Sequence, residues 1–187
     1  MSMAEEKKTL RRVIKQRQSE LHSEYREEAD RKIISLFLST SEYTKARCIF
    51  AFVGTGAEID TAEILRAALK DGKRLCVPLC VGRGVMEARE IRSPDELQPG
   101  AFGIPEPPDN TQKVDITQIN LALVPCVSCS HDGKRLGHGG GYYDRFLENF
   151  PGKTIMLCYE KLIRENIPTE SHDQIILPVI TEIGVFR

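Results

Sequence analysis

The sequence lacks a long hydrophobic run and lacks an excess of charge of either sign. Its 187 residues include 26 Lys and Arg against 27 Asp and Glu, a formal net charge of -1. No apolar run approaches the roughly 20 residues that a membrane-spanning helix needs. Residues 1–20 also lack the apolar centre of a secretory signal. We therefore expect a cytoplasmic protein with no membrane partner and no nucleic-acid partner.

The sequence also lacks internal repeats, low-complexity segments and a composition break that would mark a linker. A chain of this length with 41% hydrophobic residues can bury one sizeable core. We therefore expect residues 1–187 to form a single domain, and we expect a monomer.

Cysteine is not scarce, but its placement argues against a disulfide framework. Most of the six cysteines lie in apolar runs, which favours reduced thiols that pack as small core residues. A rival interpretation is a zinc site, because Cys126 and Cys129 are followed by His131, and Cys76 and Cys80 form a second close pair. The apolar surroundings of both pairs make core thiols the expected interpretation.

The N-terminal residues 7–17 carry six cations and no anion. Leu10, Val13, Ile14 and Leu21 recur at helical spacing, which predicts a helix with one apolar face and a basic remainder. The basic face is expected in water, in contact with nucleic acid or membrane, or against a polyphosphate. No interleaved aromatic residues support the nucleic-acid or membrane alternative.

Helical and extended patterns alternate along the rest of the chain. Residues 24–38 predict a helix that buries Ala29, Ile33, Ile34, Phe37 and Leu38. Buried strands are expected in the apolar runs at 48–53, 74–80, 85–91, 121–127 and 154–160. This order predicts an α/β fold with a mostly parallel central sheet flanked by helices on both faces.

Local signals place several helix ends. Asp60 and Glu63 predict a capping box before a helix that stops at Asp71-Gly72. Ser93 and Pro94 predict the start of a short helical turn. The segment 98–112 is rich in proline and glycine and is expected to be an ordered surface loop, and a helix is expected at 141–149.

The stretch 133–147, GKRLGHGGGYYDRFL, follows an apolar strand and precedes that last helix. Ligands of parallel sheets gather at the carboxyl ends of strands. Glycines let backbone amides turn inward, and the helix start adds its own amides, which together indicate an anion cradle. Lys134, Arg135 and His138 could meet phosphate oxygens, and Asp144 could hold Mg²⁺.

Simpler interpretations of this stretch stay open from the residues alone. It lacks the ending of a Walker A loop and the spaced glycines of a dinucleotide fingerprint, and a glycine cluster between strand and helix is often only a tight connection. Asp144 could be an ordinary first-turn helix residue that the helix dipole favours.

The segment LGHGGGYYDRFL at 136–147 closely resembles the signature of the 5-formyltetrahydrofolate cyclo-ligase family, also called methenyltetrahydrofolate synthetase. Weaker similarities follow the family's order along nearly the whole chain: the basic segment 7–17, AEIDTAEIL at 57–65, GIPEP at 103–107 and IPTESHDQ at 167–174. Their collinearity carries the assignment.

The resemblance implies an α/β fold and an enzyme that uses ATP and Mg²⁺. The implied reaction turns 5-formyltetrahydrofolate into 5,10-methenyltetrahydrofolate and releases ADP and phosphate. The formyl oxygen would be phosphorylated, and N10 would then close the ring. The substrate with or without a polyglutamate tail would be a small molecule, and the protein would mainly position reactants and neutralise phosphoryl charge.

The resemblance also implies roles for individual residues. The catalytic residues would be Arg135, Tyr142 and Asp144. The ATP-binding residues would be Lys7, Arg11, Arg135, Leu136, Gly137, His138, Gly139, Gly140, Gly141, Tyr142 and Tyr143. The folate-binding residues would be Val53, Glu58, His138, Gly139, Gly140, Gly141 and Tyr142. The magnesium-associated residues would be Asp144 and Asp173. Without the resemblance, Glu58 would be expected as a loop carboxylate in water.

The chain departs from the family pattern at 125–133, where Cys126, Cys129 and Ser130 replace a glycine, an aromatic residue and an acid. It also lacks an acid shortly after His172-Asp173. A diverged relative that binds folate or nucleotide without ligase turnover is therefore an alternative function, and an unrelated phosphosugar enzyme is a third. His172 and Tyr142 are candidate proton-transfer groups.

Overall fold

The structure is a computed structural model, and it describes residues 2–170 and 173–187. Within these residues one seven-stranded sheet runs through the molecule in the order β11-β10-β9-β6-β1-β2-β3. The strands are β1 (Cys48–Phe50), β2 (Arg74–Gly82), β3 (Val85–Ile91), β6 (Leu121–Val124), β9 (Lys153–Leu157), β10 (Val179–Thr181) and β11 (Gly184–Phe186).

The five inner strands of this sheet are parallel, and the two edge strands are antiparallel to their neighbours. Each edge strand returns through a two-residue connection, at 83–84 and at 182–183, which can only join antiparallel strands. Every residue of strands β1 and β6 is buried, as expected for strands that are covered on both faces. The prediction of a mostly parallel α/β fold is confirmed.

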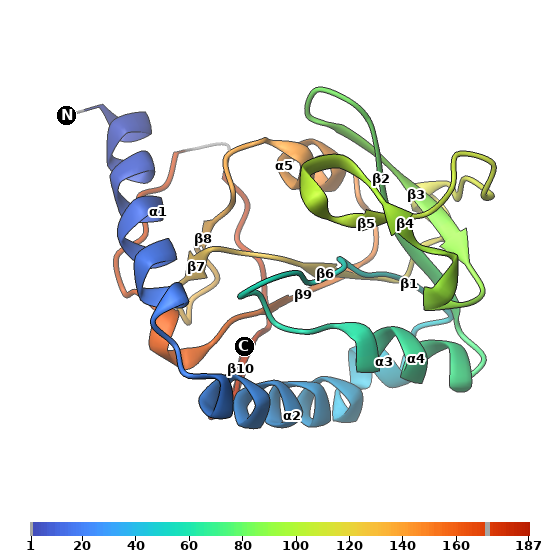
Figure 1. Cartoon of the computed structure of the whole chain (residues 1–187), viewed down its shortest axis with the longest axis horizontal. Helices are drawn as coiled ribbons and strands as arrows, with labels where there is room; N and C mark the ends of the chain where they lie inside the picture. The colour runs from blue at the N-terminus through green and yellow to red at the C-terminus, as the bar shows by residue number, and fades with distance from the viewer. Residues whose placement is uncertain (1, 171–172) are drawn as a thin grey trace.

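Helices cover the two faces of the sheet (Figure 1). The second, third and fourth helices lie along one face, the fifth lies on the other, and the first stands at one end of the molecule. The helices are α1 (Met3–Ser19), α2 (Ser23–Ser39), α3 (Ser41–Lys45), α4 (Ala62–Lys70) and α5 (Tyr142–Leu147), with short 3-10 turns η1 (Pro94–Glu96), η2 (Ala101–Gly103), η3 (Ile116–Gln118) and η4 (Glu160–Leu162). In the part of the chain that the structure describes, no helix has the length and apolar character to cross a membrane.

The first helix is longer than its basic segment, because Ser2 and Glu5 form a capping box at its start. Ile14 is fully buried, whereas Val13, which the predicted apolar face included, is 41% exposed. That face is therefore narrower than the sequence suggested. Helix α2 has the predicted extent and buries Ala29, Ile33, Ile34 and Phe37, but Leu38, which was also predicted to be buried, is only partly covered.

The predicted capping box before α4 is wrong. The helix begins after Thr61, and the Asp60 carboxylate accepts a hydrogen bond only from the Ala62 amide. The Thr61 hydroxyl is used elsewhere, since it donates to the Phe52 carbonyl and accepts from the Gly54 amide. The chain after β1 is thereby fixed to the start of α4. The predicted start of a helical turn at Ser93 and Pro94 is confirmed, and Glu96 completes a capping box there.

The predicted loop at 98–112 is ordered by a small antiparallel pair, β4 (Gln98–Pro99) with β5 (Pro105–Glu106). A second pair, β7 (Ser128–Cys129) with β8 (Arg135–Leu136), leads into the glycine-rich stretch. Helix α5 is shorter than predicted and starts directly after Gly141, which has a φ of 71°.

Phe37 offers a test of the packing between α2 and the core. Its side chain is fully buried and meets the Tyr43 ring edge-on at 5.1 Å. We expect Phe37→Ala to lower the free energy of unfolding by about 3–5 kcal/mol, through lost burial and a residual cavity. The measurement is urea unfolding. Phe102→Ala is the matched control, because Phe102 is 78% exposed and its loss should change stability by less than about 0.5 kcal/mol.

Candidate functional site

A pocket of about 770 Å³ lies where the parallel strands end. Its walls come from the residues after β1 and β6, from β2 and β3, from the 98–106 segment and from the glycine-rich stretch. This is the position that parallel sheets favour for ligands. Among the residues predicted from the sequence, those lining it are Val53, Glu58, Arg135, Gly137, His138, Gly139, Gly140, Gly141, Tyr142, Tyr143 and Asp144.

The glycine-rich stretch brings bare backbone close to cationic side chains. A Cβ at Gly137 would lie 2.9 Å from the Arg135 guanidinium, and one at Gly139 would lie 3.4 Å from that of Arg11. Gly139 also has a φ of 96°, which other residues rarely adopt. The positive φ therefore favours glycine at 139, and the bare backbone leaves room beside both guanidinium groups.

Arg135 is held from two sides. It forms an ion pair with Asp144 and donates to the Pro125 carbonyl at 3.3 Å. The Arg135 side chain is only 10% exposed, whereas that of Asp144 is 50% exposed. A mostly buried guanidinium thus faces the pocket while its carboxylate partner stays accessible. Such a pair could bind an anion through the guanidinium and a cation associated with that anion through the carboxylate.

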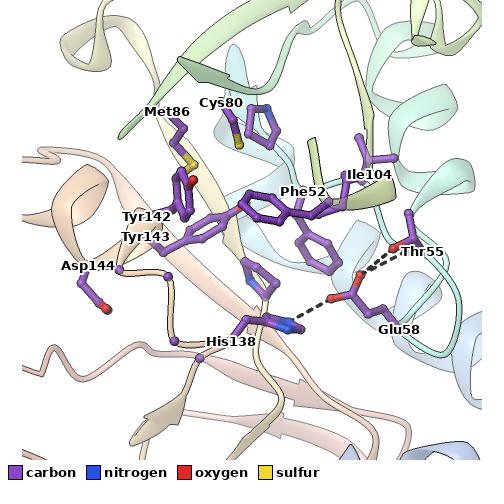
Figure 2. Close-up of a pocket in the computed structure, with 18 of the residues that line it drawn as sticks. Phe52, Thr55, Glu58, Cys80, Met86, Ile104, His138, Tyr142, Tyr143 and Asp144 are labelled. Carbon is purple, nitrogen blue, oxygen red and sulfur yellow. Dashed lines mark hydrogen bonds and ion pairs between the residues drawn. The ribbon is translucent and has the colours of Figure 1, made fainter. Parts of the chain in front are cut away.

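Glu58 lies on the far side of the pocket from Asp144, with the two tyrosines between them (Figure 2). One carboxylate oxygen is 3.0 Å from His138 Nε2, and the other accepts from the Thr55 amide at 3.1 Å. Burial disfavours the charged form, but these hydrogen bonds outweigh it and hold the pKa of Glu58 below its usual value. The expectation of a carboxylate in open water is therefore wrong, since the side chain is 19% exposed.

Residues outside the glycine-rich stretch hold the backbone at Glu58 in place. The Tyr159 hydroxyl donates to Asp30 at 2.7 Å and lies 3.4 Å from the Glu58 carbonyl oxygen. The other Asp30 oxygen accepts from the Asp60 amide at 3.4 Å. Residues of α2 and of the chain after β9 therefore hold the Glu58 loop in position. No sequence pattern had indicated this support.

Arg11, on the N-terminal helix, meets the glycine-rich stretch outside the pocket lining, whereas Lys15 and Gln18 of the same helix line the pocket. Arg11 Nε donates to the Gly137 carbonyl at 2.7 Å. One turn earlier, Lys7 Nζ lies 2.6 Å from Asp173 and 3.0 Å from Glu170. Burial opposes the charge of Lys7, but the two carboxylates outweigh it and raise its pKa. Lys7 of the basic face therefore has anionic partners within the chain.

Some predicted residues lie away from the pocket surface. Lys7, Arg11 and Asp173 are outside its lining and sit behind the glycine-rich stretch, on the α1 side. Leu136 is buried in β8, where its carbonyl accepts from the Val127 amide, so its side chain belongs to the core. His172 lies outside the described residues.

Apolar and aromatic side chains form the remaining walls, and the sequence analysis did not single them out. They are Phe52, Pro78, Met86, Phe102 and Ile104. Phe102 lies at the mouth, with its ring 6.0 Å from that of Tyr142. Its segment is anchored by the buried Glu106 carboxylate, which accepts from the Cys80 and Ala101 amides, each at 3.0 Å. The GIPEP sequence was the only available signal for this wall.

The departures from the family pattern lie just behind the pocket. Cys129 and Ser130 are buried, and Cys126 is half-buried beside them. Hydrogen bonds from Cys129 and Cys158 hold the pKa of the Cys126 thiol well below its ordinary value. His131 does not join the thiols, because its ring stacks on Phe186 and its Nε2 lies 3.1 Å from Glu160. The rival zinc set that would have included His131 is therefore not formed.

These features define an α/β protein with a glycine-rich turn flanked by arginines, beside a largely apolar pocket that ends in a carboxylate. The sequence model of the 5-formyltetrahydrofolate cyclo-ligase family matches residues 3–182. The chain belongs to this family, and it is an enzyme of the ligase class.

Individual relatives agree with this assignment. The chain is 30% identical to a probable 5-formyltetrahydrofolate cyclo-ligase of Schizosaccharomyces pombe over 70% of this chain and 72% of that protein. It is 24% identical to the 5-formyltetrahydrofolate cyclo-ligase of Escherichia coli K12 over 94% of this chain and 100% of that protein. The solved structure of Aquifex aeolicus 5,10-methenyltetrahydrofolate synthetase is similar, with a TM-score of 0.87 and 30% identity, over 97% of this chain and 92% of that one.

The Glu58 contacts predict a measurable titration. We expect the Glu58 carboxyl to titrate below 4.5, the ordinary value for Glu. A carboxyl whose pKa is lowered by folding contributes stability above its unfolded pKa and loses it as the pH falls through the folded pKa. Glu58 should therefore stabilise the fold above about pH 4.5 and cease to do so in more acidic solution.

Carbon-13 NMR of the Glu58 side chain measures this pKa. His138→Ala should raise it, because a hydrogen bond to the charged form is lost. His131→Ala is the control, since His131 contacts Glu160 instead. An identical Glu58 titration in wild type and His138→Ala would show that the pair does not form in solution.

Proposed function

We propose that this enzyme converts 5-formyltetrahydrofolate to 5,10-methenyltetrahydrofolate and consumes ATP, which binds as its Mg²⁺ complex. One observation carries the proposal. On one side of the glycine-rich turn, here called the anion side, Gly137 contacts Arg11. On the other side, His138 contacts Glu58, the carboxylate at the end of the pocket. A single short segment would therefore border both substrates.

The anion side suits a polyphosphate. Arg11 and Arg135 approach the bare backbone of the turn from two directions, and Lys7 lies one helical turn from Arg11. Cations and inward-facing amides together bind phosphate oxygens by charge-assisted hydrogen bonds. In the proposed complex, phosphate oxygens would replace the Asp144 carboxylate beside Arg135 and the Asp173 carboxylate beside Lys7.

The residues present also fit Mg²⁺. Asp144 and Asp173 offer hard carboxylate oxygens, and each lies against a cationic group of the chain, Arg135 and Lys7 respectively. Carboxylates that hold a side-chain cation can accept a metal ion when phosphates engage the arginine and lysine. When bound, the ion would neutralise charge on the phosphates during transfer.

The other side of the pocket suits a pterin. Such a ring is flat and carries adjacent hydrogen-bond donors on its amino-pyrimidinone edge, which one carboxylate can accept in pairs. Glu58 supplies a carboxylate kept ionised by its neighbours. Phe52, Tyr142 and Phe102 supply faces and edges for stacking. Val53 adds an apolar contact beside Glu58.

The proposed chemistry proceeds in two steps that balance. The formyl oxygen attacks the γ-phosphorus of ATP and ADP leaves, which turns a poor leaving group into a phosphate ester. N10 then attacks the formyl carbon and gives up its proton, and the C–O bond breaks to release inorganic phosphate. Arg135 would stabilise charge on the transferring group, and Tyr142, at the start of α5, would keep the two reactants in contact.

Ring closure is tested directly by incubating the purified chain with 5-formyltetrahydrofolate and Mg-ATP. We expect the near-ultraviolet absorbance of the methenyl product to rise and ADP to form in equal amount. ATP and folate binding without either product would instead identify a diverged binding protein.

Removing the charges on the anion side should slow the reaction. We expect Asp144→Asn and Arg135→Ala each to reduce kcat by about 100-fold or more, as is typical when one group that stabilises transition-state charge is lost. Steady-state rates of methenyl formation provide the measurement. Asp109→Asn, in the loop after β5, is the matched control and should keep wild-type rates. Wild-type kcat in Asp144→Asn would contradict the assignment.

Changing the folate side should affect a different constant. We expect Glu58→Gln to raise KM for 5-formyltetrahydrofolate by about 10-fold or more, because a charge-assisted pair of hydrogen bonds is worth about 1.5–3 kcal/mol. KM for ATP should change little. Lys7→Ala should show the reverse pattern. Equal effects of Glu58→Gln on both KM values would refute the separation of the two subsites.

A further inference from the structure

Three cysteine thiols that are distant in sequence converge behind the pocket. Cys126 follows β6, Cys129 lies in β7, and Cys158 follows β9. Strands β6 and β9 are parallel neighbours with Val124 opposite Met156, so Cys126 and Cys158 stand at equivalent positions two residues beyond that pair. All three sulfur atoms lie within 4.8 Å of one another.

This triangle matches the spacing that a tetrahedral metal ion imposes on thiolates. A zinc–sulfur distance of about 2.3 Å places the sulfurs of a tetrahedral site about 3.8 Å apart. The three thiols would therefore need to approach one another by no more than about 1 Å. The chain's other close pair, Cys48 and Cys76, has sulfurs 3.8 Å apart but no third thiol in the cluster.

A fourth ligand position and an entry path are also present. A small cavity of about 20 Å³ is lined by Cys126 and Cys158, and a space of that size holds about one water molecule. Gln18, Glu58 and Pro125 line both this cavity and the main pocket, so the thiols lie next to a solvent-connected space. Three protein ligands with one water is a common arrangement for zinc.

We propose that Cys126, Cys129 and Cys158 form a binding site for a thiophilic d10 metal ion of the Zn²⁺ class. The ion would join the ends of two parallel strands to the hairpin that precedes the glycine-rich turn. Because Arg135 donates to the carbonyl of Pro125, the residue before Cys126, the bound metal would brace the floor of the pocket. Hard Mg²⁺ would not compete for these soft ligands.

The site also has a reasonable charge balance. Three thiolates and one Zn²⁺ leave a net charge of -1 (-3 plus +2), and the positive charge of Arg135 acts on Cys126. Binding would release the thiol protons, so affinity should increase with pH. The three thiols are not among the proposed substrate ligands, and metal binding to them can be measured without either substrate.

Cobalt and zinc titrations of the reduced full-length chain test the proposal in the presence of excess Mg²⁺. We expect about one Co²⁺ per chain, with the near-ultraviolet charge-transfer bands and visible bands of a tetrahedral thiolate site, and displacement by Zn²⁺. Protein purified without chelator should carry zinc. A wild-type chain that shows no thiolate–cobalt bands would overturn the proposal, whatever the behaviour of variants.

Single substitutions identify the ligands. Cys126→Ser, Cys129→Ser and Cys158→Ser should each weaken zinc binding by more than the roughly 10–100-fold typical of outer-shell changes. Cys48→Ser is the matched buried control and should bind zinc as wild type does. Circular dichroism checks folding, and the wild-type cobalt spectrum decides the question if a variant does not fold. Equal losses in Cys48→Ser and Cys126→Ser would assign the metal elsewhere.

Discussion

The arrangement of the site depends on a backbone turn that is bare enough for cations to approach it closely. The hydrogen bond from Arg11 Nε to the Gly137 carbonyl, at 2.7 Å, joins residues 126 positions apart in the sequence. It docks α1 against the turn, and Arg135 approaches the same backbone from the pocket side. Glycine at 137 leaves room for the Arg135 guanidinium, which a Cβ would approach to 2.9 Å, and the positive φ of Gly139 shapes the turn on which α1 docks.

The same turn borders both halves of the proposed site. On its proposed anion side Asp144 pairs with Arg135 and Asp173 pairs with Lys7, while Arg11 bonds the Gly137 carbonyl. On its folate side His138 contacts Glu58, whose loop rests on the Asp30–Tyr159 pair. In the proposed reaction a polyphosphate would replace the first set of carboxylates, and the pterin would use the Glu58 carboxylate. Both substrates would therefore bind against the same segment of the chain.

Much of this could be predicted from the sequence, because the relevant signals are local or follow the family's order. Apolar runs predicted the strands, spacing predicted α2, and the glycine-rich signature predicted the site at the strand ends. Features set by tertiary packing could not be predicted. The Thr61 hydroxyl bonds the chain after β1 and does not cap α4. Phe102 joins the pocket wall because Glu106 anchors its segment. Cys158 meets Cys126 only through the register of the two strands before them. The exposed Val13 shows that an apolar pattern sets a helix face only approximately.

The central claim is that the formyl oxygen is the group phosphorylated before N10 closes the ring. Labelling this oxygen with oxygen-18 and analysing the released phosphate by mass spectrometry tests it most directly. The account predicts that inorganic phosphate carries the label in proportion to methenyl product, because the C–O bond breaks on the formyl side. Label found in water, with unlabelled phosphate, would contradict phosphoryl transfer to the formyl oxygen.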